Sequence, residues 1–410
     1  MGSKYATPGL APKPQQTMLS FFITLLIFVV VGYFALFPPT RSLSRLRSRL
    51  EGMLLRIPLP SYLGPPSDLA IAVRSFSDYH HAQSQALNPR WRSYERLPRK
   101  QRALGDKLGW KNKLHEVEEA VSVNARICEL LGVLGMDEAR RTGEVLGFRS
   151  RFSRQDGRVI EVLKHFVRDW SEEGKSERDA LFPPILDALT TEFGGRIKSG
   201  EKPRVLVPGS GLARLAYEIA SSGFHATAND YSHFMNIGAS LIFKATTRTN
   251  EHIVHPYLHT FSHHRSTDSM IRGARFPDVV PSRDADLEFK SGDFLRLFPE
   301  PSSFDAIATL FFIDTVSVQH RLVSRNDLAT AQARGLWINE GPCLWFGTPR
   351  MALAMDDIVR LAELIGFVIE DRKTIKEARY TSDTEGMYMF AYDCEFWVAR
   401  KPTAVGTRTP

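Results

Sequence analysis

The segment from Arg204 to Asp230 constrains the fold of this chain more than any other part. It contains a short apolar run at Val205–Val207, a turn with two glycines, and a stretch with helical spacing from Leu212 to Ala220. Asp230 ends a second short run, roughly 20 positions after the first glycine, where a carboxylate can accept hydrogen bonds from ribose hydroxyls. The pattern predicts a nucleoside-binding βαβ unit.

The glycine turn narrows the choice of cofactor. Gly209 and Gly211 allow a sharp turn and a close approach of the backbone to a ligand. A dinucleotide fingerprint has a third glycine where this chain has Arg214, and a pyrophosphate needs an uncluttered helix N-terminus. The turn therefore favours S-adenosylmethionine, which is cationic and carries no phosphate. A purely structural turn that binds nothing is the alternative.

After Asp230 the chain alternates between predicted helices and strands. A helix is predicted from Tyr231 to Lys244. Two late strands follow one another without a helix between them, which predicts an antiparallel pair at the end of a parallel sheet. This arrangement is typical of the α/β Rossmann fold of class I methyltransferases. The predicted strands are 287–291, 304–313, 335–339, 367–374 and 388–399, with a helix at 355–365.

An irregular insertion is predicted from about residue 245 to Asp284. It contains five histidines, but cysteine or carboxylate ligands do not cluster with them, so we predict exposed loop histidines and no metal site. The histidines are His252, His255, His259, His263 and His264.

The N-terminal part contains an uncharged apolar stretch, Met18–Phe37, long enough to cross a bilayer as a helix. Five arginines follow it within twenty residues, so the positive-inside bias places the C-terminal bulk in the cytosol. Three scattered cysteines agree with a reducing compartment. We predict a single-pass membrane protein; a buried core helix is the alternative.

The net charge of +7 and the pI of about 9.3 also raise the possibility of nucleic-acid binding. Much of the basic excess lies beside the apolar stretch, so a membrane surface is the simpler partner and nucleic acid is not expected. A homodimer is left open. The predicted division is a tail (1–17), a transmembrane helix (18–37), a basic amphipathic and Pro-rich segment (38–75), an α-helical domain (76–200), a Rossmann domain (201–402) and a tail (403–410).

Several motifs together resemble the carnosine N-methyltransferase family, also called N2227-like. The motifs are FVRDWSEEGKSERD at 166–179, VLVPGSGLARLAYEIA at 205–220, ATAND at 226–230, GDF at 292–294, FFIDT at 311–315, WINEGP at 337–342 and YDCEFWVARKP at 392–402. The resemblance implies methyl transfer from S-adenosylmethionine to an imidazole nitrogen. The acceptor would be a small molecule, carnosine or a related histidine-containing peptide, and the product would be of the anserine type.

The resemblance also implies roles for particular residues. Asp314 would hold the imidazole N–H and is the predicted catalytic residue. Tyr392 would close the substrate pocket, although a core tyrosine in the last strand is the alternative. The residues implied in cofactor binding are His165, where the family has glutamine, Arg168, Gly209, Gly211, Asp230, Asp293, Phe294 and Leu310.

The chain departs from the family pattern in two places. Phe346 stands where the family has a histidine that helps to hold the dipeptide, and residues 316–334 lack the usual L-K-P-G-G. Two alternatives to carnosine methylation therefore remain: a diverged substrate such as RNA, protein or another small molecule, and a catalytically weak cofactor-binding homologue.

Overall fold

The computed structural model describes residues 67–144, 154–298, 304–314, 333–345, 351–381 and 383–401. All of them belong to one compact unit, Pro65–Pro410. The predicted membrane span Met18–Phe37 lies outside the described residues, as do residues 38–66 of the basic and Pro-rich segment that follows it. Among the helices that are described, none is long and apolar enough to cross a membrane.

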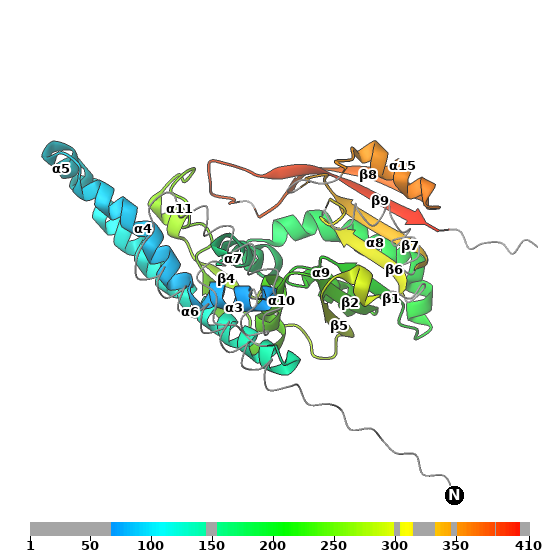
Figure 1. Cartoon of the computed structure of the whole chain (residues 1–410). Helices are drawn as coiled ribbons and strands as arrows, with labels where there is room; N and C mark the ends of the chain where they lie inside the picture. Colours follow the sequence, from blue (N-terminus) through cyan, green and yellow to red (C-terminus); the bar gives the residue numbers. More distant parts are fainter. Residues whose placement is uncertain are drawn as a thin grey trace, which may run out of the picture. The chain divides into compact units, whose positions relative to one another are not determined.

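Seven strands form one mixed sheet in the order β5-β2-β1-β6-β7-β9-β8 (Figure 1). The first five pair in parallel, and β9 pairs antiparallel with both β7 and β8. This is the strand order of class I methyltransferases, so the predicted Rossmann-like α/β fold with a final antiparallel pair is confirmed. The strands are β1 (Arg204–Pro208), β2 (His225–Asp230), β5 (Leu287–Ser291), β6 (Phe304–Leu310), β7 (Ala333–Gly341), β8 (Val368–Arg379) and β9 (Ala391–Arg400).

Two apolar layers cover the sheet. Helices α8 (Lys175–Lys198) and α9 (Arg214–Ser221) bury their apolar sides with Val205 and Val207 of β1. Leu206, whose side chain points to the opposite face, packs instead with α15 (Met355–Leu364). This alternation follows the two-residue period of a strand, and it leaves the carboxyl ends of β1, β2 and β6 available for a ligand site.

The helical region lies before the sheet in the sequence, as predicted, although its first helix begins at Asp68. Ser67 caps this helix by accepting a hydrogen bond from the backbone N–H of Ala70. α6 begins after Gly109 and ends at Gly143, both with positive φ. The helices are α3 (Asp68–Ser77), α4 (Tyr79–Glu95), α5 (Arg99–Lys107), α6 (Trp110–Thr142) and α7 (Asp156–Trp170).

The segment after β2 also differs in part from the prediction. The helix expected from Tyr231 to Lys244 forms as α10 (His233–Ser240) followed by a π-helical turn, η2 (Leu241–Ala245). Both pack into the same core as α3, α6 and α7, which shields their apolar side chains. The predicted boundary between a helical domain and a Rossmann domain remains a prediction.

The insertion is more regular than predicted. It contains an antiparallel pair, β3 (His252–Val254) and β4 (Ala274–Phe276), and a short helix, α11 (Thr267–Ile271). Its anchor is Asn124 of α6, which accepts a hydrogen bond from the His255 N–H at 2.7 Å and donates one to the His255 carbonyl at 2.9 Å. A long-range side-chain contact of this kind leaves no periodic signal in the sequence.

The prediction of exposed histidines is wrong for most of the five. His263 is exposed, whereas the other four are half-buried. His259 is hydrogen-bonded to the Tyr79 hydroxyl at 2.7 Å, and burial lowers its pKa to about 4. These side chains serve the packing of the insertion on the helices. Among the described residues, no group of three or more His, Cys, Asp or Glu side chains could hold a metal.

Candidate active site

A cleft with about 490 Å³ of empty space lies where the carboxyl ends of β1 and β6 meet the last turns of α7. The structure brings five of the predicted site residues together there. They line the cleft with Tyr380, which the sequence analysis missed. The five are His165, Arg168, Gly209, Gly211 and Leu310.

The glycine turn has a geometry that only glycine fits. Gly209 and Gly211 have φ values of 66° and 57°. A Cβ added at Gly209 would lie 2.4 Å from the Cδ2 atom of Phe312. The turn is held in place because the Ser210 N–H donates to the carbonyl of Asn229 at 3.0 Å. The backbone of this turn therefore forms a rigid wall of the cleft.

Asp230 connects the glycine turn to the end of β2. Its Oδ2 accepts a hydrogen bond from the Gly211 N–H at 2.9 Å, and its Oδ1 accepts one from the Ser232 N–H at 2.7 Å. Burial raises the pKa of this carboxyl, and the two N–H donors oppose that effect. Each oxygen retains a lone pair, so the carboxylate can still accept bonds from two ribose hydroxyls.

The last turns of α7 place a buried cation at the cleft. The Arg168 guanidinium lies 3.6 Å from the Asp169 carboxylate and 4.6 Å from the centre of the Tyr380 ring. His165 Nδ1 lies 3.4 Å from Asp169. Burial opposes ionisation of Asp169, but the Arg168 charge and the His165 hydrogen bond outweigh it and lower the pKa. The Arg168 guanidinium also lies 3.7 Å from the Glu177 carboxylate. It has five N–H donors and lines the cleft, so it can also donate to an anionic ligand group such as an amino-acid carboxylate.

The predicted substrate residues lie beyond the end of β6 and on β9. Asp314 is buried, and its Oδ2 accepts a hydrogen bond from the Leu344 N–H at 2.7 Å. Burial raises its pKa. Burial, with the nearby Tyr380 and Asp314, also raises the pKa of Tyr392 to about 12. Phe346, the third predicted substrate residue, lies outside the described residues.

An aromatic cluster connects the cleft to Tyr392, one of the predicted substrate residues. The Phe311 ring centre lies 4.7 Å from that of Tyr380 and 5.8 Å from that of Tyr392. The Arg168 guanidinium lies 5.5 Å above Phe311. Phe311 has a φ of 52°, an uncommon value for a bulky residue and one that is found at functional turns. The sequence analysis missed Phe311 and Tyr380 as site residues.

Asp293 and Phe294 follow β5, as predicted, but do not line this cleft. The Phe294 ring is buried and meets the Phe312 ring edge-on, with the ring centres 5.4 Å apart. It supports the wall behind the glycine turn, because Phe312 also lies against Gly209. Asp293 is half-buried, with Arg296 3.6 Å away.

Glu340 is a further residue that the sequence analysis did not single out, although it interrupts an apolar strand in WINEGP. It is fully buried in β7, next to Leu310 of β6 in the sheet register. Within the described structure, neither carboxyl oxygen has a hydrogen-bond partner. Burial raises its pKa to about 9, so the group is a neutral acid at pH 7.

These features fit S-adenosylmethionine residue by residue. The backbone of the turn at Gly209 lines the cleft, and Asp230 retains acceptor capacity for ribose hydroxyls. Arg168 supplies a buried cation for the amino-acid carboxylate, and the faces of Phe311 and Tyr380 suit a sulfonium cation.

Comparisons with known proteins give the family. The carnosine N-methyltransferase family model matches residues 149–403. A carnosine N-methyltransferase of Mus musculus is 30% identical over 80% of this chain and 85% of its own length. The chain belongs to the carnosine N-methyltransferase family. It is a methyltransferase that uses S-adenosylmethionine, as the sheet order and the cleft already indicate.

Two further relatives are also described as carnosine N-methyltransferases. A carnosine N-methyltransferase of Schizosaccharomyces pombe is 32% identical over 59% of this chain and 70% of its own length. The Drosophila melanogaster protein is also 32% identical over 59% of this chain, which covers 54% of that relative. Among solved structures, a magnesium protoporphyrin IX methyltransferase of Synechocystis PCC 6803 is 13% identical with a TM-score of 0.34, covering 65% of this chain and 94% of that one.

Proposed function

We propose that this methyltransferase transfers a methyl group to an imidazole nitrogen of carnosine or of a related histidine-containing peptide. The observation that carries the proposal is the placement of Asp314. Asp314 follows β6, and its carboxylate is buried close to Tyr392. Phe311, which lies three residues earlier in the chain, lines the cofactor cleft and lies near the Arg168 guanidinium. An acid in this place can bind one ring nitrogen while the other faces the cofactor.

S-adenosylmethionine supplies an electrophilic methyl group when it is bound. A neutral imidazole nitrogen forms the new N–CH3 bond as the S–CH3 bond breaks, so S-adenosylhomocysteine leaves uncharged and the ring becomes an imidazolium. Asp314 accepts the hydrogen bond from the other ring N–H, which selects the reactive tautomer. Its negative charge then stabilises the cation that forms.

The remaining contribution of the protein is orientation. A well-oriented reaction between two bound molecules can gain roughly 7 to 11 kcal/mol relative to the reaction in solution. Here the glycine turn and Arg168 would hold the cofactor, and Asp314 would hold the acceptor. Phe311 lies between these two parts of the cleft, where its ring can separate the reacting atoms from water.

A methyl-transfer assay on a panel of acceptors tests the proposal. The full-length protein is incubated with labelled S-adenosylmethionine and, in separate reactions, with carnosine, free histidine and a dipeptide that lacks imidazole. We expect label in carnosine and none in the imidazole-free dipeptide. Asp314→Asn should reduce the rate at least 100-fold, while Asp371→Asn, an exposed acid on β8, should leave it unchanged.

Transfer to an imidazole-free acceptor alone would overturn the proposed substrate. The departure at Phe346 favours one such alternative, a diverged acceptor, because the family's histidine helps to hold the dipeptide. RNA and protein acceptors are therefore included in the panel. Cofactor binding without transfer to any of these acceptors would favour a catalytically weak homologue.

We also propose that Met18–Phe37 anchors the chain in a membrane, with the catalytic part in the cytosol. The proposal is supported by twenty uncharged residues followed by an arginine-rich segment. The protein should stay in the membrane pellet after alkaline carbonate extraction, and a variant lacking residues 1–37 should not. Release of the full-length protein by carbonate would contradict the proposal. A homodimer is a further untested prediction, which the mass of the purified protein from light scattering would decide.

A further inference from the structure

The end of α7 is held by hydrogen bonds from outside the helix. Its last carbonyl groups would otherwise lack partners, because the final turn of a helix has no N–H groups to pair with them. Four successive carbonyls each accept a bond from another segment. Arg178 Nη1 donates to the carbonyls of Arg168 (2.7 Å) and Ser171 (2.9 Å), Arg214 Nη1 donates to that of Asp169 (3.0 Å), and the Asp278 N–H donates to that of Trp170 (2.8 Å).

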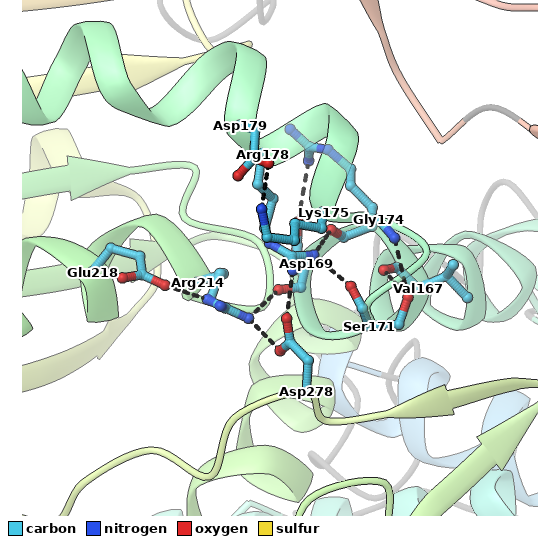
Figure 2. A network of polar contacts seen from close by, with 11 residues as sticks. Val167, Asp169, Ser171, Gly174, Lys175, Arg178, Asp179, Arg214, Glu218 and Asp278 are labelled. Carbon is cyan, nitrogen blue, oxygen red and sulfur yellow. Dashed lines mark hydrogen bonds and ion pairs between the residues drawn. The ribbon is translucent and has the colours of Figure 1, made fainter.

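Asp278 joins the two arginines to each other (Figure 2). Its Oδ2 accepts a hydrogen bond from Arg178 Nη2 at 2.5 Å, and its Oδ1 accepts one from Arg214 Nη1 at 2.6 Å. The exposed fractions of the three side chains are only 6%, 10% and 13% for Arg178, Arg214 and Asp278. One carboxylate thus orients two buried guanidinium groups that come from different helices.

The charge of Asp278 makes this arrangement tolerable. Burial and the like charge of Arg214 both act to lower the pKa of Arg178, and Asp278 opposes them. The carboxylate of Glu218 accepts a hydrogen bond from Arg214 Nε at 2.7 Å. Removing the Asp278 charge would leave two buried cations facing each other, and at least one of them would have to turn away from the carbonyl groups.

The same turn of α7 carries the cofactor side chains. Arg168 and Asp169 face the cleft with their side chains, while their carbonyl groups face Arg178 and Arg214. Trp170 connects this turn to the glycine loop, because its Nε1–H donates to the carbonyl of Leu212 at 3.0 Å. A shift of the turn would therefore move the Arg168 guanidinium relative to the loop.

We propose that Asp278 is a positioning residue for cofactor binding. It lines neither the cofactor side nor the substrate side of the site and acts through Arg178 and Arg214, which fix the end of α7 and hence the Arg168 guanidinium. This also gives a role to Arg214, which occupies the third position of the glycine motif. Its guanidinium lies 4.8 Å from the centre of the Trp170 ring and serves the α7 end instead of approaching a phosphate.

The test compares Asp278→Asn with a matched variant in the full-length protein. The matched control is Asp305→Asn, which likewise removes a carboxylate that accepts two hydrogen bonds, in this case one from a guanidinium (Arg196, 2.7 Å) and one from a backbone N–H (Arg204, 2.8 Å). Asp305 lies at the start of β6, at the end of the sheet away from the cleft. Both variants are examined by calorimetric titration with S-adenosylhomocysteine and by thermal unfolding.

We expect Asp278→Asn to raise the dissociation constant for S-adenosylhomocysteine about tenfold. Asp305→Asn should change it less than about twofold, even if both variants unfold at lower temperature. An equal, small change in affinity for the two variants would overturn the proposal and leave Asp278 with a structural role only. Binding of the product cofactor does not depend on the methyl acceptor, so this result is independent of the carnosine proposal.

A second variant protects the test against poor folding of Asp278→Asn. Arg178→Lys keeps the positive charge, but an ammonium group cannot bind Asp278 and the carbonyls of Arg168 and Ser171 as one guanidinium does. Arg178 is chosen because Arg214 itself lines the cleft, where its replacement could act on the cofactor directly. Arg178→Lys should weaken S-adenosylhomocysteine binding in the same direction. In the double variant the two effects should not add, because both act through one network. Full additivity, or unchanged binding in Arg178→Lys, would contradict the proposed coupling.

Discussion

Replacing Glu340 by glutamine should make the folded protein more stable at alkaline pH and remove a part of its pH dependence. The side chain is fully buried between β6 and β9, where Leu310 and Phe396 are its register partners. Burial raises its pKa to about 9, from an ordinary value of 4.5. Glutamine has nearly the same shape and is never charged.

The size of the effect follows from the two pKa values. Between pH 4.5 and pH 9 the folded protein keeps a proton on Glu340 that the unfolded chain has released. The folded state then binds more protons, so the free energy of unfolding falls as pH rises, by about 1.4 kcal/mol per pH unit. From pH 5.5 to pH 8 the loss amounts to about 3 kcal/mol.

Thermal unfolding at pH 5.5 and pH 8, followed by fluorescence, measures this difference. The difference in unfolding temperature between Glu340→Gln and the parent should be several degrees larger, in favour of Glu340→Gln, at pH 8 than at pH 5.5. Glu363→Gln serves as the control, because Glu363 is exposed on α15. If Glu340→Gln and the parent lose stability in parallel over this range, the Glu340 carboxyl is ionised in the folded protein and the reasoning is refuted.

Three further predictions concern the cleft. Gly209→Ala should weaken S-adenosylhomocysteine binding at least tenfold and destabilise the fold by about 1 to 3 kcal/mol, since its φ of 66° and the nearby Phe312 ring leave no space for a Cβ; unchanged calorimetric affinity would contradict this. Asp230→Asn should raise the same dissociation constant about tenfold through lost ribose bonds, without a matching loss of carnosine binding. For Asp314, burial raises the pKa, so its active charged form is lost at a higher pH than for an ordinary aspartate as the solution is acidified. In the parent, both Asp314 and the substrate imidazole must be deprotonated, so the acid limb of log kcat/KM against pH should approach a slope of 2. In Asp314→Asn only the imidazole titrates, and the slope should be 1. A slope of 1 in both proteins would exclude this role of Asp314.

The sheet and the glycine turn could be predicted because their signals are local. An apolar run before two glycines, a helix after them and an acid at the next strand end are sufficient to define the βαβ unit. The final antiparallel pair was predictable from two strands without an intervening helix. Its register was not, and β9 begins at Ala391, three residues later than predicted, because the residues before it form no ladder with β8.

Other parts of the site could not be predicted from local patterns, because distant segments meet there. Tyr380 and Phe311 lie about 70 positions apart in the sequence, yet their rings are 4.7 Å apart. Asp278 binds Arg178 across 100 positions. Neither pair has a spacing that periodicity can reveal. Glu340 is different, since a lone acid inside an apolar strand was visible in the sequence and marked an unusual buried group.

Identification of the methylated atom tests the central claim most directly. The full-length protein is incubated with carnosine and S-adenosylmethionine that carries a 13C-labelled methyl group, and the product is examined by NMR. We expect one labelled methyl group bonded to an imidazole nitrogen, and we expect Asp314→Asn to form this product at least 100-fold more slowly. A methyl group on the amino nitrogen, or no methylated carnosine from protein that binds S-adenosylhomocysteine, would contradict the assignment of this cleft to imidazole methylation.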